Sequence, residues 1–295
     1  MIVVESLTKR YGRTRAVDGL SFTARPGRVT ALLGPNGAGK TTTLRALLGL
    51  ARPTAGSATV DGRPYAELAD PCRTVGAVLE VHTFHPWRSA RAHLRALAYG
   101  AGLAEDRVET TLRRVGLADD ADRRVGGYSY GMRQRLSLAA ALLGDPGVLI
   151  LDEPQNGLDP QATRWLRELL RSLAAGGRTV LISSHLLAEM SEVADDVVVV
   201  DSGRLVRQAP LAELLAQTGE SVRVASPDAE RFAKVLAAGG MPADPVGDGR
   251  LLVRGRAPAV GSLAAEHGVT LHELTPQRSG LEDVYLALTG EQGED

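Results

Sequence analysis

Five segments of the chain are apolar at nearly every position, and stretches long enough for helices separate most of them: 29–33, 75–79, 148–151, 179–182 and 197–200. Strands that are apolar throughout, without alternation, are typical of a parallel sheet covered on both faces. The pattern therefore predicts an α/β core. Shorter strand-like segments bounded by turns predict an antiparallel flank, at 2–8, 21–24 and 57–60.

The pattern changes twice along the chain. Between Pro86 and Leu143 it predicts only helices, separated by glycines, at 90–101, 104–115 and 130–143. After Gly203 it follows the order β-α-β-β-α-β of a ferredoxin-like unit, over 221–225, 228–238, 242–246, 251–254, 258–267 and 269–274, with a last helix at 280–288. We therefore predict an α/β domain over 1–215 with a helical subdomain at about 86–145, and a small α+β domain over 216–295.

Composition limits the classes of function. The chain has 295 residues and a net charge of −1, so no overall field attracts nucleic acid. The single cysteine, Cys72, excludes an internal disulfide framework and favours a reducing compartment. The first residues lack the cationic-then-apolar order of a signal peptide, and no apolar run reaches 18 residues. We expect a soluble protein with no nucleic-acid partner.

The strongest motif follows the first apolar strand and reads Gly34-Pro35-Asn36-Gly37-Ala38-Gly39-Lys40-Thr41, with Thr42 next. It matches the phosphate-binding loop G-x-x-x-x-G-K-[ST], in which glycines let backbone N–H groups surround phosphate oxygens. Lys40 supplies a positive charge near the β- and γ-phosphates, and Thr41 can place its hydroxyl on Mg²⁺. The loop predicts binding of ATP with Mg²⁺.

A second motif is the strand at 148–151 followed by two carboxylates, Asp152 and Glu153. Asp152 is placed to hold Mg²⁺ through water, and Glu153 to orient and deprotonate the attacking water. A strand-end acidic pair is common in isolation, but its combination with the phosphate loop favours catalysis.

Tyr128-Ser129-Tyr130-Gly131-Met132-Arg133-Gln134-Arg135 resembles the signature sequence of the ATP-binding-cassette (ABC) ATPases. Ser129 at a helix start is by itself explained as an N-cap, although the free N–H groups there also suit a γ-phosphate. Three further segments resemble motifs of that family: Asn156-Gly157-Leu158-Asp159 its D-loop, His185 its switch histidine, and Tyr11-Gly12 the loop whose ring stacks on adenine. The resemblance covers roughly residues 1–215.

The resemblance implies two cassettes that enclose two ATP molecules head to tail. Because this chain carries one cassette, its partner would be a second copy or a sister subunit, and both would act with transmembrane permease subunits. The implied catalytic residues are Lys40, Glu153 and His185, and Mg²⁺ would be held by Thr41, Glu80 and Asp152. The implied nucleotide contacts are Tyr11, Gly34, Pro35, Asn36, Gly37, Ala38, Gly39, Lys40, Thr41, Thr42, Glu80, Ser129, Gly131, Met132 and Asp159.

Three positions depart from the common family pattern. Glu80 stands where most members have glutamine, and Tyr130 and Met132 alter the signature. These features, with the tail 279–290, resemble the bacitracin-type, lantibiotic-type and daunorubicin-type exporter ATPases. The resemblance implies an exporter ATPase, peripheral on the cytoplasmic face of the membrane, with an unidentified cargo. Two alternatives stay open: a sensor or self-resistance module coupled to a membrane partner without transport, and a soluble ABC ATPase acting on ribosomes or DNA.

The loop 81–91 contains His82 and His85, but no cysteine or paired carboxylate completes a tetrahedral metal site with them. In the family that the chain resembles, this loop lies beside the groove that receives a membrane subunit. The resemblance therefore implies that Phe84 and Trp87 belong to a docking surface, and the alternative is a local hydrophobic plug.

Overall fold

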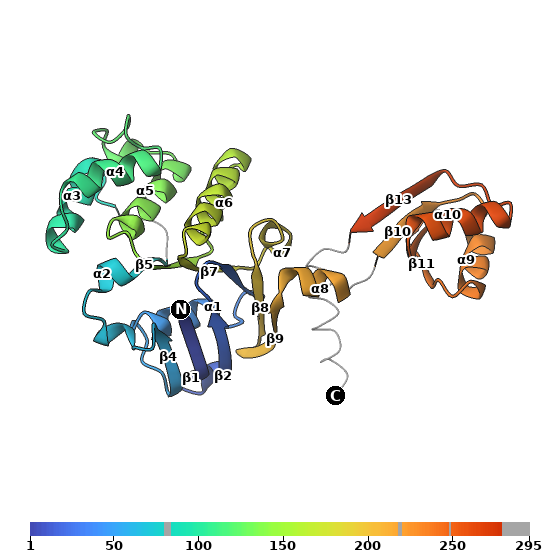
Figure 1. Cartoon of the computed structure of the whole chain (residues 1–295), viewed down its shortest axis with the longest axis horizontal. Helices are drawn as coiled ribbons and strands as arrows, with labels where there is room; N and C mark the ends of the chain where they lie inside the picture. Colours follow the sequence, from blue (N-terminus) through green and yellow to red (C-terminus); the bar gives the residue numbers. More distant parts are fainter. Residues whose placement is uncertain (80–83, 218–219, 248, 279–295) are drawn as a thin grey trace. The chain divides into compact units, whose positions relative to one another are not determined.

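The computed structural model describes residues 1–79, 84–217, 220–247 and 249–278, and it divides into two compact units, Met1–Leu211 and Ala212–Asp295 (Figure 1). Each unit is described by itself.

The first unit is built on a six-stranded sheet in the order β5-β6-β7-β3-β8-β9. Its strands are β3 (Val29–Leu33), β5 (Val75–Val78), β6 (Val148–Asp152), β7 (Thr179–Ser184), β8 (Asp196–Asp201) and β9 (Arg204–Pro210). All neighbours are parallel except β9, which pairs antiparallel with β8 at the edge. The five predicted apolar strands are confirmed, whereas β9 was not predicted.

A second, antiparallel sheet has the order β2-β1-β4. Its strands are β1 (Ile2–Tyr11), β2 (Thr14–Ala24) and β4 (Ala55–Val60). The predicted antiparallel flank is confirmed, and β1 and β2 are longer than predicted. Helix α1 (Lys40–Leu47) shares a buried core with this sheet, through Leu44 and Leu47 on the helix and Ile2 and Leu7 on β1.

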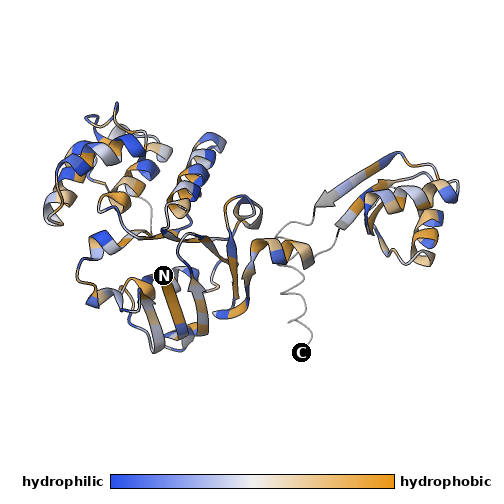
Figure 2. Ribbon diagram, viewed as in Figure 1, coloured by the Kyte–Doolittle hydropathy of each residue, from blue (hydrophilic) through white to orange (hydrophobic). Residues whose placement is uncertain are grey.

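The segment between β5 and β6 forms the three predicted helices, α3 (Ala90–Gly100), α4 (Asp106–Arg114) and α5 (Tyr130–Leu142). Helices α3 and α4 each bury one stripe and carry hydrophilic residues on their other faces (Figure 2), whereas α5 is buried on several sides. The remaining elements of the unit are η1 (Tyr65–Glu67), α2 (Pro71–Thr74), η2 (Val125–Gly127), α6 (Pro160–Ala175) and α7 (Leu187–Met190).

The second unit begins within α8 (Leu211–Gln217) and has a four-stranded antiparallel sheet in the order β11-β12-β10-β13. Its elements are β10 (Glu220–Ala225), α9 (Ala229–Ala238), β11 (Ala243–Pro245), β12 (Arg250–Arg254), α10 (Ala257–Glu266) and β13 (Glu273–Arg278). This order of strands and helices is ferredoxin-like, which confirms the prediction. The helix predicted at 280–288 lies outside the described residues.

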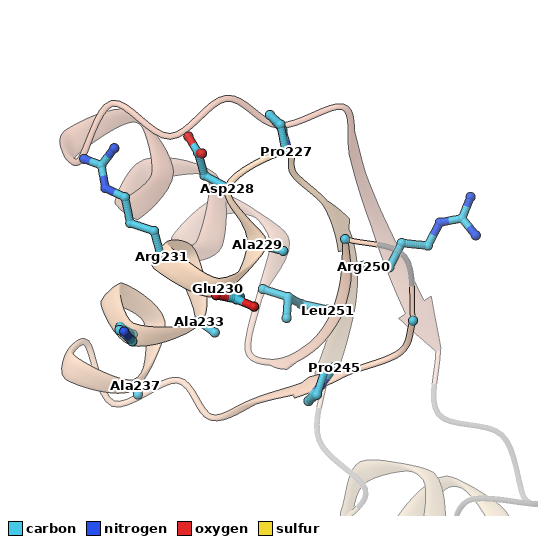
Figure 3. Close-up of a pocket in the computed structure, with 13 residues that line it drawn as sticks. Pro227, Asp228, Ala229, Glu230, Arg231, Ala233, Ala237, Pro245, Arg250 and Leu251 are labelled. Carbon is cyan, nitrogen blue, oxygen red and sulfur yellow. The ribbon is translucent and has the colours of Figure 1, made fainter.

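An open cleft of about 1000 Å³ lies between α9 and the β11–β12 hairpin of this unit (Figure 3). Ala229, Ala233 and Leu251 form its apolar side, and the Glu230 carboxylate lies beside them. None of its lining residues belongs to the motifs found in the sequence.

Candidate functional site

The phosphate loop runs from the end of β3 to the start of α1, and two of its glycines have positive φ, 86° at Gly37 and 95° at Gly39. A Cβ on Gly39 would lie 2.4 Å from the carbonyl oxygen of Ala16, and a Cβ on Gly34 would lie 2.2 Å from that of Val200. Glycine is therefore required for both conformation and space. The loop ends at the positive end of α1, a position that favours anions.

Lys40 is almost fully buried, at 6% exposure, and its charge is held inside the loop. Its Nζ donates hydrogen bonds to the carbonyl oxygens of Gly34, at 2.7 Å, and Pro35, at 3.2 Å. The same Nζ lies 3.4 Å from Oε1 of Glu153. Lys40 thus has both a loop cradle and a carboxylate partner that an anionic ligand can replace.

A cavity of about 360 Å³ lies over this loop. Its lining comprises Ala16, Asn36, Gly37, Gly39, Lys40, Thr41, Thr42 and Glu153. Six of these are predicted loop residues and Glu153 is the predicted base, whereas Ala16 was not predicted. Ala16 comes from β2 and is brought here by tertiary structure, so no local motif could have identified it.

The predicted carboxylates lie at the carboxyl end of β6, next to β7. Asp152 pairs with Ser183 across the two strands, and the buried Ser183 hydroxyl donates a hydrogen bond to Oδ1 of Asp152. The same hydroxyl accepts a hydrogen bond from the backbone N–H of Glu153 at 3.0 Å. Ser183 therefore orients both carboxylate residues, a role that the sequence did not reveal.

Glu153 has a φ of 48°, in the left-handed region that non-glycine residues rarely occupy. Such backbone strain persists where surrounding contacts over-determine it, and it is frequent at functional sites. Here the strain directs the carboxylate between two predicted catalytic residues. Oε1 faces Lys40, and Oε2 lies 2.8 Å from Nδ1 of His185.

The oxygen donors around the loop suit Mg²⁺, which prefers carboxylate and hydroxyl ligands. The Asp152 carboxylate is buried at 7% exposure, with Ser183 as its hydroxyl donor, and Thr41 lines the cavity at the first turn of α1. Glu80, the third predicted ligand, lies outside the described residues.

The signature and D-loop residues occupy two exposed helix starts. Ser129 caps α5 by accepting a hydrogen bond from the N–H of Met132 at 3.2 Å. Asp159 caps α6 by accepting one from the N–H of Ala162 at 2.7 Å. Ser129 is therefore an N-cap, as its place at a helix start suggested. The side chain is also exposed, so a second molecule can reach it.

The remaining predicted residues are distributed over the surface of the first unit. Tyr11 ends β1, half exposed, with the ammonium of Lys9 4.8 Å from its ring centroid. Phe84 packs edge-on against His93, with ring centroids 5.0 Å apart, while Trp87 is 69% exposed. Burial lowers the pKa of His93 below its ordinary value.

A buried parallel strand followed by a glycine-rich loop and a helix, with two carboxylates at the end of β6 in the same sheet, defines a P-loop nucleoside triphosphatase. Comparison with known proteins then identifies the family. The family described as "ABC transporter" matches residues 17–156, and one described as "Domain of unknown function (DUF8746)" matches residues 220–282.

Among similar curated proteins, "Nod factor export ATP-binding protein I" of Burkholderia orbicola (strain AU 1054) is 38% identical, over 98% of this chain and 97% of that protein. The protein of the same name from Ralstonia nicotianae is 37% identical, over 100% of this chain and 95% of its own length. The chain therefore belongs to the ABC transporter family and is one of its ATP-binding ATPase subunits.

Solved structures agree. The "ATP binding subunit of ABC transporter" is similar with a TM-score of 0.67 at 28% identity, covering 74% of this chain and 93% of its own. A dimeric ATP-binding cassette bound to ADP and Pi has the same fold, with a TM-score of 0.64 at 23% identity, covering 72% and 99% of the two chains. In the part of the chain that the structure describes, no helix is long and apolar enough to cross a membrane.

Proposed function

We propose that this chain is the ATP-hydrolysing subunit of a multisubunit exporter, in which separate membrane subunits carry the cargo. The observation that carries the hydrolytic part is the Glu153 carboxylate held between Lys40 and His185 above the phosphate loop. The direction of transport is supported by relatives named as export proteins, which are aligned over nearly their whole length.

In the proposed mechanism, the phosphates of ATP replace Glu153 and the loop carbonyls as partners of Lys40. The freed carboxylate of Glu153 then orients a water molecule and accepts its proton, while His185 contacts the γ-phosphate. Mg²⁺, held by Thr41 and Asp152 and additionally by Glu80, would neutralise the charge that develops on the phosphates. The loop N–H groups stabilise the same charge without reorganisation.

Two cassettes would enclose two ATP molecules. Ser129, Gly131 and Met132 of one chain would contact the phosphates held by the other, with Asp159 beside them, and Tyr11 would stack on adenine. The exposure of Ser129 and Asp159 supports this arrangement. The second cassette is either another copy of this chain or a sister subunit.

The chain would be peripheral, held on the inner face of the membrane by a permease subunit. Trp87 supports this docking because it is 69% exposed with the Arg124 guanidinium 5.1 Å from its ring centroid, and tryptophan and arginine are enriched among the residues that contribute most to binding. Cargo selection would then belong to the membrane subunits.

The test is affinity purification of this chain from its native membranes in mild detergent, followed by mass spectrometry. We expect a partner with several membrane-spanning helices and no phosphate loop of its own. Trp87→Ala should reduce its recovery, whereas Tyr99→Ala, which removes a 91% exposed aromatic from α3, should not. Recovery of ribosomal proteins, or of no membrane protein, would contradict the exporter function and leave the ATPase intact.

A further inference from the structure

We propose that Tyr130 is a positioning residue that holds the D-loop, residues 156–159, against the N-terminus of α5. It would thereby fix the spacing of Ser129 and Asp159 before a second cassette arrives. This inference rests on the dimer of the proposed function and assigns a role to the residue that departs most from the family's signature.

The contact is between the Tyr130 ring and Gly157. A Cβ built on Gly157 would lie 3.1 Å from Cε1, 3.2 Å from Cζ and 3.5 Å from Cδ1 of the ring. The ring therefore covers the Cα of Gly157, whose φ of 73° already disfavours other residues. Tyr130 thus faces the D-loop of its own chain.

Neighbouring contacts extend this one into a continuous junction. A Cβ on Gly131 would lie 3.9 Å from Cβ of Ala162 and 4.0 Å from Cδ2 of Leu158. One turn further along α5, Nε2 of the buried Gln134 donates to the carbonyl oxygen of Pro154 at 2.7 Å. The start of α5 therefore contacts the D-loop through Tyr130 and the chain before it through Gln134, and Gly131 faces Leu158 and Ala162.

This junction matters because it carries the two exposed caps, Ser129 on α5 and Asp159 on α6. A surface whose polar groups are already in place loses less conformational entropy on association than one that must be ordered. Gly157 would make the D-loop mobile by itself, and the aromatic ring restricts it. The phosphate loop lies in other elements, so single-chain ATP binding does not depend on Tyr130.

The experiment compares Tyr130→Ala and Tyr130→Phe with the parent, and uses Tyr99→Ala as the control for removal of an exposed tyrosine. ATP-dependent self-association is measured by sedimentation velocity in a Glu153→Gln background, where ATP is retained. Steady-state kcat and KM are measured in chains that keep Glu153. We expect Tyr130→Ala to weaken association about threefold to tenfold and to lower kcat, with the ATP affinity of the single chain unchanged. Tyr130→Phe, which keeps the ring over Gly157, should weaken association less than Tyr130→Ala.

Gly157→Ala perturbs the same contact from the other side, by adding an atom instead of removing the ring. The added methyl group would lie 3.1 Å from the ring and strain the backbone. It should weaken association as well, so the inference stays testable even if Tyr130→Ala folds poorly. Equal association of parent, Tyr130→Ala and Gly157→Ala would overturn the inference alone. A loss in Tyr130→Phe equal to that in Tyr130→Ala would also overturn it. A parent that hydrolyses ATP without self-associating would overturn the inference and would exclude a second copy of this chain as the second cassette of the proposed function.

Discussion

Replacement of Glu153 by glutamine separates the chemistry of the site from nucleotide binding. Glutamine keeps the size of the side chain and an oxygen acceptor for His185, but it cannot take a proton from water. A positioned general base contributes about 10²–10⁴-fold to a rate. We therefore expect hydrolysis to fall by that factor, which corresponds to about 2.7–5.4 kcal/mol of transition-state stabilisation.

The affinity for ATP should not fall together with the rate of hydrolysis. Lys40 lies 3.4 Å from Glu153, and this pair must separate before Lys40 can reach a phosphate. A neutral amide competes less well for the ammonium than a carboxylate does, by about 1 kcal/mol. The affinity for ATP should therefore stay unchanged or increase up to about fivefold.

The assay pairs phosphate release with equilibrium binding of a fluorescent ATP analogue. Glu168→Gln is the matched control, because Glu168 lies on α6 at 69% exposure in an i,i+4 pair with Arg164 and should leave both measurements unchanged. Turnover of Glu153→Gln within threefold of the parent would remove Glu153 as the base. Loss of ATP binding would instead show that Glu153 holds the loop in its binding conformation.

Two further predictions concern the scaffold. A Cβ on Gly76 would lie 2.1 Å from the carbonyl oxygen of Ala141, so Gly76→Ala should lower the free energy of unfolding by about 1–3 kcal/mol, whereas Gly147→Ala, which has open space, should not. Equal denaturation midpoints would refute this. Because burial lowers the pKa of His93, the unfolded chain binds more protons below about pH 6.5, and acidification destabilises the fold. The stability advantage of the parent over His93→Gln should therefore shrink between pH 7.5 and 5.5, and a constant difference in urea titrations would contradict it.

The sequence predicted the central strands because strands covered on both faces are apolar without alternation. It did not reveal β9, since this edge strand carries Arg204, Arg207 and Gln208 and resembles a loop. Helix α6 was also not predicted, although Asp159 as N-cap and Pro160 at the first turn mark its start. Strand β9 was missed because it is a polar edge strand, whereas α6 could have been predicted from its N-cap and proline.

Site residues were predictable where the chemistry is contiguous in the chain. The phosphate loop and the pair Asp152–Glu153 are local motifs, and the structure brings loop residues and Glu153 to one cavity; their roles stay predictions. Ala16 and Ser183 could not be predicted, because they reach the site from other strands. Ala16 contributes only its position beside Gly39, and Ser183 contributes a hydroxyl. Neither residue type by itself indicates a nucleotide site.

The segment from Asp152 to Asp159 joins two places that the proposed dimer would use together. At one end, Glu153 faces Lys40 of its own phosphate loop; at the other, Asp159 lies on the surface proposed to meet the second cassette. Between them, Gln155 is buried and its Nε2 lies 3.4 Å from Oγ of Ser184, the residue before His185. A shift of the D-loop on association would therefore reach Glu153 along the chain and His185 through the contact between Gln155 and Ser184. Such a short buried connection gives a physical route by which a second cassette could control hydrolysis in the first.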